Sequence, residues 1–178
     1  HGVPKHLLRV GDGTWFDAVH GALAPHTDEV FALGVGQLPE THADLTRLKD
    51  ADDGEGPLAG MLAALRHRRD ACWIIVACDQ PLLTSDAVGW LLRQRGAGRF
   101  IVMPRAQHDL ANPFPGVYEP QALALLEGLI ALGRPSPSRL ADHPSVYVPS
   151  VPAELRPAWS NLNRPRDVAK LLPPAGDV

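Results

Sequence analysis

Apolar and polar positions along the chain follow two patterns: unbroken apolar runs, typical of buried strands, and helical spacing, typical of amphipathic helices. Residues 72–77 are apolar without alternation, which indicates a strand that is covered on both faces. Residues 57–69 instead repeat apolar side chains at helical spacing, from Leu58 to Leu65. Pro57 suits the first turn of that helix, because no backbone N–H is needed there. The chain is therefore expected to contain both kinds of element.

Segments of the two kinds alternate from one end of the chain to the other. We expect strands at 29–36, 72–79, 98–104 and 145–151, the last at a sheet edge, and helices at 14–23, 57–69, 84–95, 120–133 and 164–172. Thr14 and either Thr84 or Ser85 are the expected N-caps of two helices. This order predicts an α/β fold, a three-layer sandwich with a mostly parallel central sheet. Ligands of such sheets bind outside the carboxyl ends of the strands, and Asp79 stands at such an end.

Length and composition are those of one globular domain. With 178 residues, a net charge of −3 and 45% hydrophobic residues, the chain fits a single domain at 1–172 followed by a frayed tail at 173–178. The slight negative charge argues against a nucleic-acid partner, and the lack of a long apolar run argues against a membrane span. Cys72 and Cys78 are expected to be buried core thiols of a reducing compartment, which favours the cytoplasm.

Four short fragments carry the candidate chemistry. They are GVPKHLL (2–8), GPLAG (56–60), ACDQP (77–81) and NLNRPRDV (161–168). Together, in this order, they resemble the molybdenum cofactor guanylyltransferases, a MobA-like family of nucleotidyltransferases, over almost the whole chain. The resemblance implies a nucleotide-diphospho-sugar transferase-like fold and transfer of GMP from GTP to the molybdopterin cofactor with release of pyrophosphate. It also implies Mg²⁺ as the cofactor and molybdenum cofactor insertion proteins as further partners.

Lys5 and Asp79 are the residues best suited to the transfer step. The ammonium group of Lys5 could neutralise a triphosphate, although most lysines are simply solvated. A carboxylate at a strand tip could hold Mg²⁺, which favours one or two carboxylates together with phosphate oxygens. Asp79 could instead cap the following turn, but Thr84, Ser85 and Asp86 already supply caps there. The resemblance implies that both residues are catalytic and bind the nucleotide, and that Asp79 binds the metal.

The GPLAG fragment is the candidate for binding the nucleoside. Its glycines let the backbone approach a flat ligand, although the same fragment also begins a helix with a small-residue face. The resemblance implies that Gly56, Pro57 and Leu58 lie beside the base and ribose. It also implies a nucleoside contact for the aspartate that ends the preceding short strand. Asp50 matches that place, although the acidic run 50–55 is of a kind that usually forms a solvated loop.

Asn161 and Asn163 are the candidates for binding the acceptor. They alternate around Leu162, so their amides point to the same side if this segment is extended. The alternative is an Asx-turn before a helix, with Asn163 as its cap. The resemblance implies that both amides contact the acceptor.

The fragments leave the substrates open. GVPKHLL and CDQP also occur in cytidylyl relatives, whereas GPLAG and the N-x-N ending favour guanine. Leu33 occupies a place where a polar base-reading residue is expected. The alternatives are a cytidylyl or other nucleotidyltransferase that uses CTP and a different phosphate acceptor, or a non-catalytic nucleotide-binding homologue.

An apolar strand and a glycine-rich phosphate loop are expected ahead of His1. The related families begin with such a strand, and the loop after it wraps the triphosphate with backbone N–H groups. The opening HGVPK corresponds to the residues that directly follow that loop. A parallel sheet that lacks a central strand exposes apolar edges, so we expect the natural protein to carry this strand.

Overall fold

The computed structural model describes residues 4–34, 36–106 and 110–162. The helices in these ranges are α1 (Trp15–Leu23), α2 (Pro57–His67), α3 (Ser85–Leu92) and α4 (Ala122–Ala131). The strands are β1 (Arg9–Val10), β2 (Gly13–Thr14), β3 (Ala32–Leu33), β4 (Arg47–Leu48), β5 (Trp73–Ile75), β6 (Ile101–Val102), β7 (Gly116–Tyr118) and β8 (Val146–Tyr147). Short 3₁₀ turns join them: η1 (Lys5–Leu7), η2 (Ala24–His26), η3 (Glu40–His42), η4 (Pro137–Leu140) and η5 (Ala153–Trp159). The expected last helix, 164–172, lies outside the described residues.

The predicted N-termini of α1, α2 and α3 are confirmed, because local chemistry sets each of these three. Thr14 caps α1 in a capping box: its Oγ1 accepts the N–H of Asp17, whose carboxylate accepts the N–H of Thr14. Thr84 Oγ1 accepts the N–H of Ala87 at the start of α3. Pro57 is the first residue of α2.

The main sheet has the strand order β5-β7-β6-β8 and is mixed. β7 runs antiparallel to both of its neighbours, whereas β6 and β8 are parallel and β8 lies at the expected edge. β3 and β4 form a separate parallel pair, and β1 and β2 a small antiparallel hairpin. The prediction of one mostly parallel central sheet is therefore wrong in this respect. The described residues between β6 and β7 hold no helix, so the chain turns back and pairs antiparallel.

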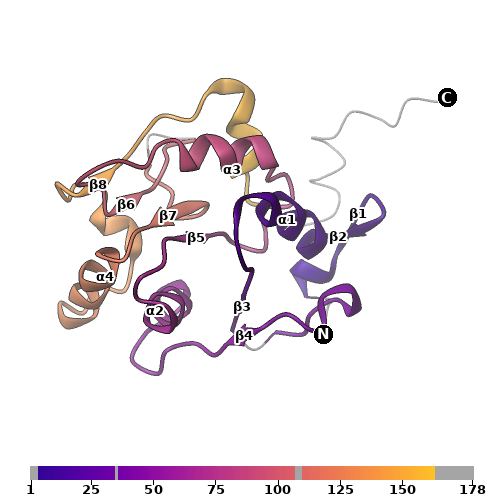
Figure 1. The fold of residues 1–178 in the computed structure, drawn as a ribbon, viewed down its shortest axis with the longest axis horizontal. Helices are drawn as coiled ribbons and strands as arrows, with labels where there is room; N and C mark the ends of the chain where they lie inside the picture. Colours follow the sequence, from indigo (N-terminus) through magenta and orange to yellow (C-terminus); the bar gives the residue numbers. More distant parts are fainter. Residues whose placement is uncertain (1–3, 35, 107–109, 163–178) are drawn as a thin grey trace.

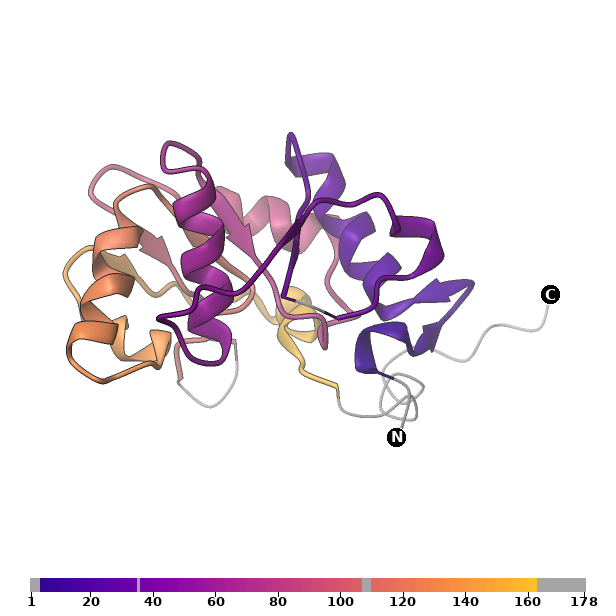
Figure 2. The same cartoon turned by 90° about the horizontal axis from the view of Figure 1, so that it is seen from below.

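Helices cover the main sheet on both faces, as expected for three layers. α2 and α4 pack together on one face, and α3 lies on the other face with α1 beside it (Figures 1 and 2). The core on the α2 side contains the fully buried Leu58, Leu62 and Leu126, and the core on the α3 side contains Val88 and Trp159. No helix within the described ranges is both long and apolar enough to cross a membrane.

β3 and β5 run close to each other without pairing in the described part of the chain. β3 pairs with β4 and β5 pairs with β7, so one edge of each strand faces the space between them. At their amino ends, Glu29 forms an ion pair with Arg68, and the ring centroids of Phe31 and Trp73 are 5.3 Å apart. The two strands therefore frame a space that borders the candidate site.

Candidate active site

Lys5 and Asp79 lie together at one edge of the molecule. Lys5 Nζ is 3.8 Å from Asp79 Oδ2, and the two side chains are 47% and 24% exposed. A tight charge-assisted hydrogen bond measures about 2.7–2.9 Å, so this ion pair is loose. Both charged groups therefore stay partly exposed to solvent, where a third group such as a phosphate can reach them.

His6 joins this edge to the end of β3. His6 Nε2 lies 2.5 Å from Gln37 O, in the segment that follows β3. Its neighbour Lys5 contacts Asp79, in the segment that follows β5. The carboxyl ends of β3 and β5 thus meet at η1, the kind of place where α/β sheets bind ligands.

Backbone contacts hold Asn161 next to Asp79. The N–H of Leu162 donates to Asp79 O over 2.9 Å, and Asn161 directly precedes Leu162 with its side chain exposed. The structure therefore brings together Lys5, Asp79 and Asn161 from three distant parts of the chain. Asn163 lies outside the described residues.

Gln80 is a residue of this region to which the sequence reasoning gave no role. Its side chain is 0% exposed; its Oε1 accepts the N–H of Ala77 over 3.3 Å and its Nε2 donates to Phe114 O over 2.8 Å. The sequence signal was weak: Gln80 lies between the apolar run 72–77 and Leu82, and a glutamine buried there must find hydrogen-bond partners.

Asp50 lies over two glycines at the carboxyl end of β3. A Cβ added at Gly60 would come within 3.3 Å of Asp50 Oδ1, and one added at Gly34 within 3.7 Å of Asp50 Oδ2. The short strand that was expected ahead of Asp50 is β4, which pairs with β3. Leu33, 37% exposed, lies beside Gly60 on the same surface. Asp50 and the end of the GPLAG fragment are therefore adjacent in space.

The first three residues of GPLAG differ in what they offer a ligand. Gly56 precedes α2 with φ of 54°, a conformation that glycine adopts without strain. Pro57 is exposed, whereas Leu58 has its side chain fully buried in the core. Only the backbone of Leu58 is therefore available to a nucleotide.

Cys78 departs from the expectation of two buried thiols. Cys72 is half-buried, but Cys78 is exposed, because β5 ends at Ile75 and the chain leaves the sheet before Cys78. Desolvation and the negative charge of Asp79 raise the pKa of Cys78, and the charge of Lys5 opposes this rise. The Cys78 thiol therefore lies within the electrostatic reach of both charges of the site.

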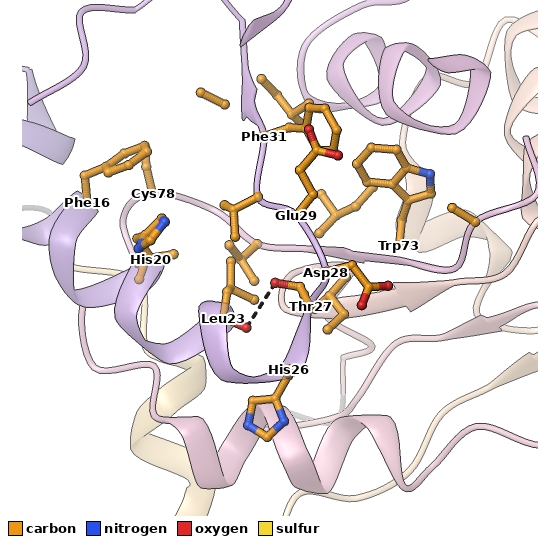
Figure 3. Close-up of a pocket in the computed structure, with 18 of the residues that line it drawn as sticks. Phe16, His20, Leu23, His26, Thr27, Asp28, Glu29, Phe31, Trp73 and Cys78 are labelled. Carbon is orange, nitrogen blue, oxygen red and sulfur yellow. Dashed lines mark hydrogen bonds between the residues drawn. The ribbon is translucent and has the colours of Figure 1, made fainter. Parts of the chain in front are cut away.

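A cavity of 590 Å³ opens beside the charged pair, between β3 and β5 (Figure 3). Its apolar lining comes from α1, from the region of β3 and from β5: Phe16, Val19, Leu23, Phe31, Trp73 and Ile74. One end of the cavity reaches His6 and Cys78, the chain neighbours of Lys5 and Asp79. The unpaired edges of β3 and β5 thus line a cavity that ends at the site.

The Asp79 carboxylate fits a magnesium ion whose other ligands are mainly waters and phosphate oxygens. No group of three His, Cys, Asp or Glu side chains that could hold a metal gathers within the described ranges. Mg²⁺ binds through one or two carboxylates and completes its shell with waters and phosphate oxygens. Asp79, partly exposed in the turn after β5 rather than at the expected strand tip, offers one such hard oxygen ligand, and a bound nucleotide would offer the others.

The fold is that of the α/β nucleotidyltransferases. It is similar to molybdopterin-guanine dinucleotide biosynthesis protein A from Archaeoglobus fulgidus, with a TM-score of 0.68 and 23% identity over 95% of this chain and 89% of that one. It is equally similar to 2-C-methyl-D-erythritol 4-phosphate cytidylyltransferase from Thermus thermophilus, with a TM-score of 0.68 and 15% identity over 94% and 91% of the two chains. These two proteins and this chain thus share one architecture.

Residues 1–170 match the MobA-like NTP transferase domain, and the chain belongs to that family. It is similar to the molybdenum cofactor guanylyltransferase of Pseudomonas putida, with 36% identity over 121 residues, which cover 66% of this chain and 62% of that protein. It is also similar to a probable molybdenum cofactor guanylyltransferase of Pelotomaculum thermopropionicum, with 28% identity over 177 residues, which cover 95% and 84% of the two proteins. The family expected from the four fragments is therefore confirmed.

Proposed function

We propose that this chain transfers GMP from GTP to the molybdopterin cofactor and releases pyrophosphate. A phosphate oxygen of the molybdopterin attacks the α-phosphorus of GTP in line. The bond from that phosphorus to the oxygen that bridges to the β-phosphorus breaks, and pyrophosphate leaves with the bonding electrons. The names of the relatives support the two substrates, and the fold supports the class of reaction.

The side chains at the carboxyl ends of the strands divide the work of this transfer. Magnesium, when bound, would neutralise the phosphate oxygens and favour charge build-up on the leaving group. Asp79 is the ligand that the chain offers to that ion. Lys5 neutralises charge on the triphosphate and on the departing pyrophosphate. Asn161, together with Asn163, orients the acceptor through its amide.

The nucleoside half of GTP is assigned to the surface at the carboxyl end of β3. Asp50 lies over Gly34 and Gly60 there, so an exposed carboxylate stands over two residues that have no side chain of their own. Gly56 and Pro57 are exposed at the start of α2. A flat base can approach such a surface closely, and the carboxylate can accept hydrogen bonds from a ribose or a base edge.

The 3.8 Å approach of Lys5 Nζ to Asp79 Oδ2 carries this proposal. Pyrophosphate release is to be measured with GTP, CTP or ATP and Mg²⁺, with and without molybdopterin. We expect release with GTP only when molybdopterin is present, and none from Asp79→Asn. Asp86→Asn, an exposed carboxylate of the first turn of α3, is the matched control and should retain full activity. Undiminished release by a folded Asp79→Asn protein rejects the assignment.

A cytidylyltransferase with another phosphate acceptor is the second candidate. The observation that favours it is Leu33, an exposed apolar side chain beside Gly60 and Asp50 where a guanine-reading group is expected. Thermal shifts with each nucleotide separate the two candidates. A larger shift with CTP than with GTP supports the cytidylyl function, and the reverse supports the guanylyl function.

We also propose that the cavity between β3 and β5 receives the apolar strand expected ahead of His1. Both flanking strands present an unpaired edge to the cavity, and its lining is mostly apolar. A strand parallel to β3 and β5 would end beside His6 and Cys78, where the first described residues lie. A phosphate loop that follows such a strand would bring its backbone N–H groups next to Lys5.

A further inference from the structure

Gln80 is the buried polar side chain nearest in the chain to the proposed metal ligand. Its exposed fraction is 0%, and among the described residues it is the fully buried polar side chain that is not aromatic. The adjacent Asp79 has a side chain 24% exposed, so a partly exposed carboxylate and a buried amide follow each other in the turn after β5. Burying an amide without partners is costly, so its hydrogen bonds must account for its place.

The Gln80 amide uses both of its ends. Oε1 accepts the N–H of Ala77 within the turn, and Nε2 donates to Phe114 O, which belongs to the segment 112–115 ahead of β7. The backbone O of Gln80 accepts the N–H of Leu83 over 3.1 Å. One side chain therefore ties the turn that carries Asp79 both to itself and to a distant segment.

The segment 112–115 is itself held firmly. Asn112 Oδ1 accepts the N–H of Phe114 over 3.0 Å, and Tyr118 Oη donates to Pro113 O over 2.7 Å. Tyr118 is fully buried, and burial raises the pKa of its hydroxyl, so this donor keeps its proton. Gln80 thus binds to a rigid support.

The same segment reaches the acceptor side of the site. Trp159 Nε1 donates to Pro115 O over 3.3 Å, and the N–H of Leu162 donates to Asp79 O over 2.9 Å. The contacts form a closed ring that runs from Asp79 through Gln80, the segment 112–115 and Trp159 to Leu162 and back to Asp79. Asp79 and Asn161 are therefore fixed relative to each other by one hydrogen-bonded frame.

We propose that Gln80 is a positioning residue that fixes the Asp79 carboxylate and couples it to Asn161. The proposal rests on the metal and acceptor roles proposed above for those two residues. Glutamine suits the task because it carries an acceptor for Ala77 and a donor for Phe114 at the required reach. Methionine has the same length without either group, and glutamate keeps the acceptor but loses the donor when ionised.

The test compares Gln80→Met and Gln80→Glu with the wild-type protein. We expect kcat for pyrophosphate release to fall about 10- to 100-fold, since a displacement near 1 Å can cost about that much. The KM for the nucleotide should stay within about twofold, because Asp50 and the GPLAG surface are untouched. The Mg²⁺ concentration for half-maximal activity should rise. A nucleotide KM that rises while kcat stays unchanged overturns the proposal.

A second measurement needs no turnover. The amide proton of Leu162 bonds to Asp79 O, so its hydrogen exchange reports on the ring directly. We expect faster exchange at Leu162 in Gln80→Met, in protein without substrate, and weaker binding of Mn²⁺ with GTP by calorimetry. Unchanged exchange at Leu162 overturns the coupling. If the wild-type protein releases no pyrophosphate but exchange at Leu162 is altered in the variant, only the proposed transferase function is overturned.

Thr84→Ala is the matched control for stability. Thr84 caps α3 a few residues after Gln80, and it accepts hydrogen bonds from Ala87 and Val88, which belong to α3 and not to the ring. Its unfolding midpoint should fall, whereas kcat, Mg²⁺ dependence and Leu162 exchange should stay at wild-type values. Trp159→Phe opens the ring at another point. The kcat of the double variant with Gln80→Met should therefore fall by less than the product of the two single-variant reductions in kcat. Independent, multiplicative losses contradict the closed ring.

Discussion

Lys5 Nζ lies 3.8 Å from Asp79 Oδ2, so η1 and the turn after β5 share one charged edge. Exposed ion pairs contribute about 0–1 kcal/mol to folding, so stability does not explain this contact. A lysine and a carboxylate that stay partly solvated beside each other are suited to a ligand that carries both phosphate and a divalent cation. The relationship therefore predicts effects on turnover rather than on folding.

Lys5→Met should lower kcat for pyrophosphate release by about 10²–10³-fold, the usual cost of removing one group that stabilises charge in a transition state. The urea midpoint should not change. Lys49→Met is the matched control, because Lys49 also pairs with an aspartate, Asp52, and is 75% exposed. Equal losses in the two variants would show that Lys5 has no special role.

Gly60→Ala should weaken nucleotide binding about tenfold, the equivalent of about 1.4 kcal/mol. The added methyl group would lie 3.3 Å from Asp50 Oδ1 and would push that carboxylate from its place. Calorimetric titration with GTP measures the change. Gly128→Ala in α4 is the control, since a Cβ there meets nothing within 4 Å and should leave binding unaltered. Wild-type affinity in Gly60→Ala contradicts a nucleoside site at Asp50.

Asp17 should make folding sensitive to acid. Burial alone would raise its pKa, but hydrogen bonds from Thr14 and Thr41 and the charge of His42 lower the pKa to about 2. A carboxyl whose pKa is lower in the folded state stabilises that state at pH values above its pKa in the unfolded chain. This contribution disappears as the pH falls toward 2. We expect about 1 kcal/mol to be lost in this window after screening by solvent.

Urea unfolding of wild-type and Asp17→Asn proteins between pH 5 and pH 2 checks this expectation. The free energy of unfolding of the variant should fall less across that pH window than that of the wild-type protein. Asp12→Asn, an exposed loop residue near the same helix, should follow the wild-type curve. Parallel curves for wild-type and Asp17→Asn would contradict the assignment.

A strand that fills the cavity between β3 and β5 should protect the Leu33 amide from hydrogen exchange. The N–H groups of Ala32 and Gly34 bond to Thr46 O and Leu48 O in β4 and next to it. Since peptide groups alternate along a strand, the Leu33 N–H faces the cavity. A chain with an apolar strand ahead of His1 should show much slower exchange at Leu33 and little change at Gly34. Equal rates at Leu33 with and without the strand contradict the proposed filling.

Local chemistry explains which parts of the structure were predictable from the sequence. Thr14, Pro57 and Thr84 act within a few residues of themselves, so the starts of α1, α2 and α3 could be read directly. Asp79 was singled out because it follows a buried apolar run, and its role in the site stays a prediction. The meeting of Lys5 with Asp79 came from the family resemblance, since no local rule brings such distant residues together.

The missed features depend on contacts between distant segments. An apolar run such as 116–118 indicates a strand but carries no direction, so the antiparallel course of β7 could not be read. The exposure of Cys78 follows from the early end of β5, which apolar composition alone does not reveal. Gln80 is satisfied by Phe114, and such a partner is visible only after folding.

The edges of β3 and β5 that stay unpaired in the described part of the chain should also affect how molecules of this protein associate with one another. Unpaired strand edges are templates on which an extended segment of a neighbouring molecule can add. While these edges stay open, self-association should grow with protein concentration. A strand that pairs with these edges would remove the template. The protein with such a strand should therefore remain monodisperse at concentrations at which the protein without it precipitates.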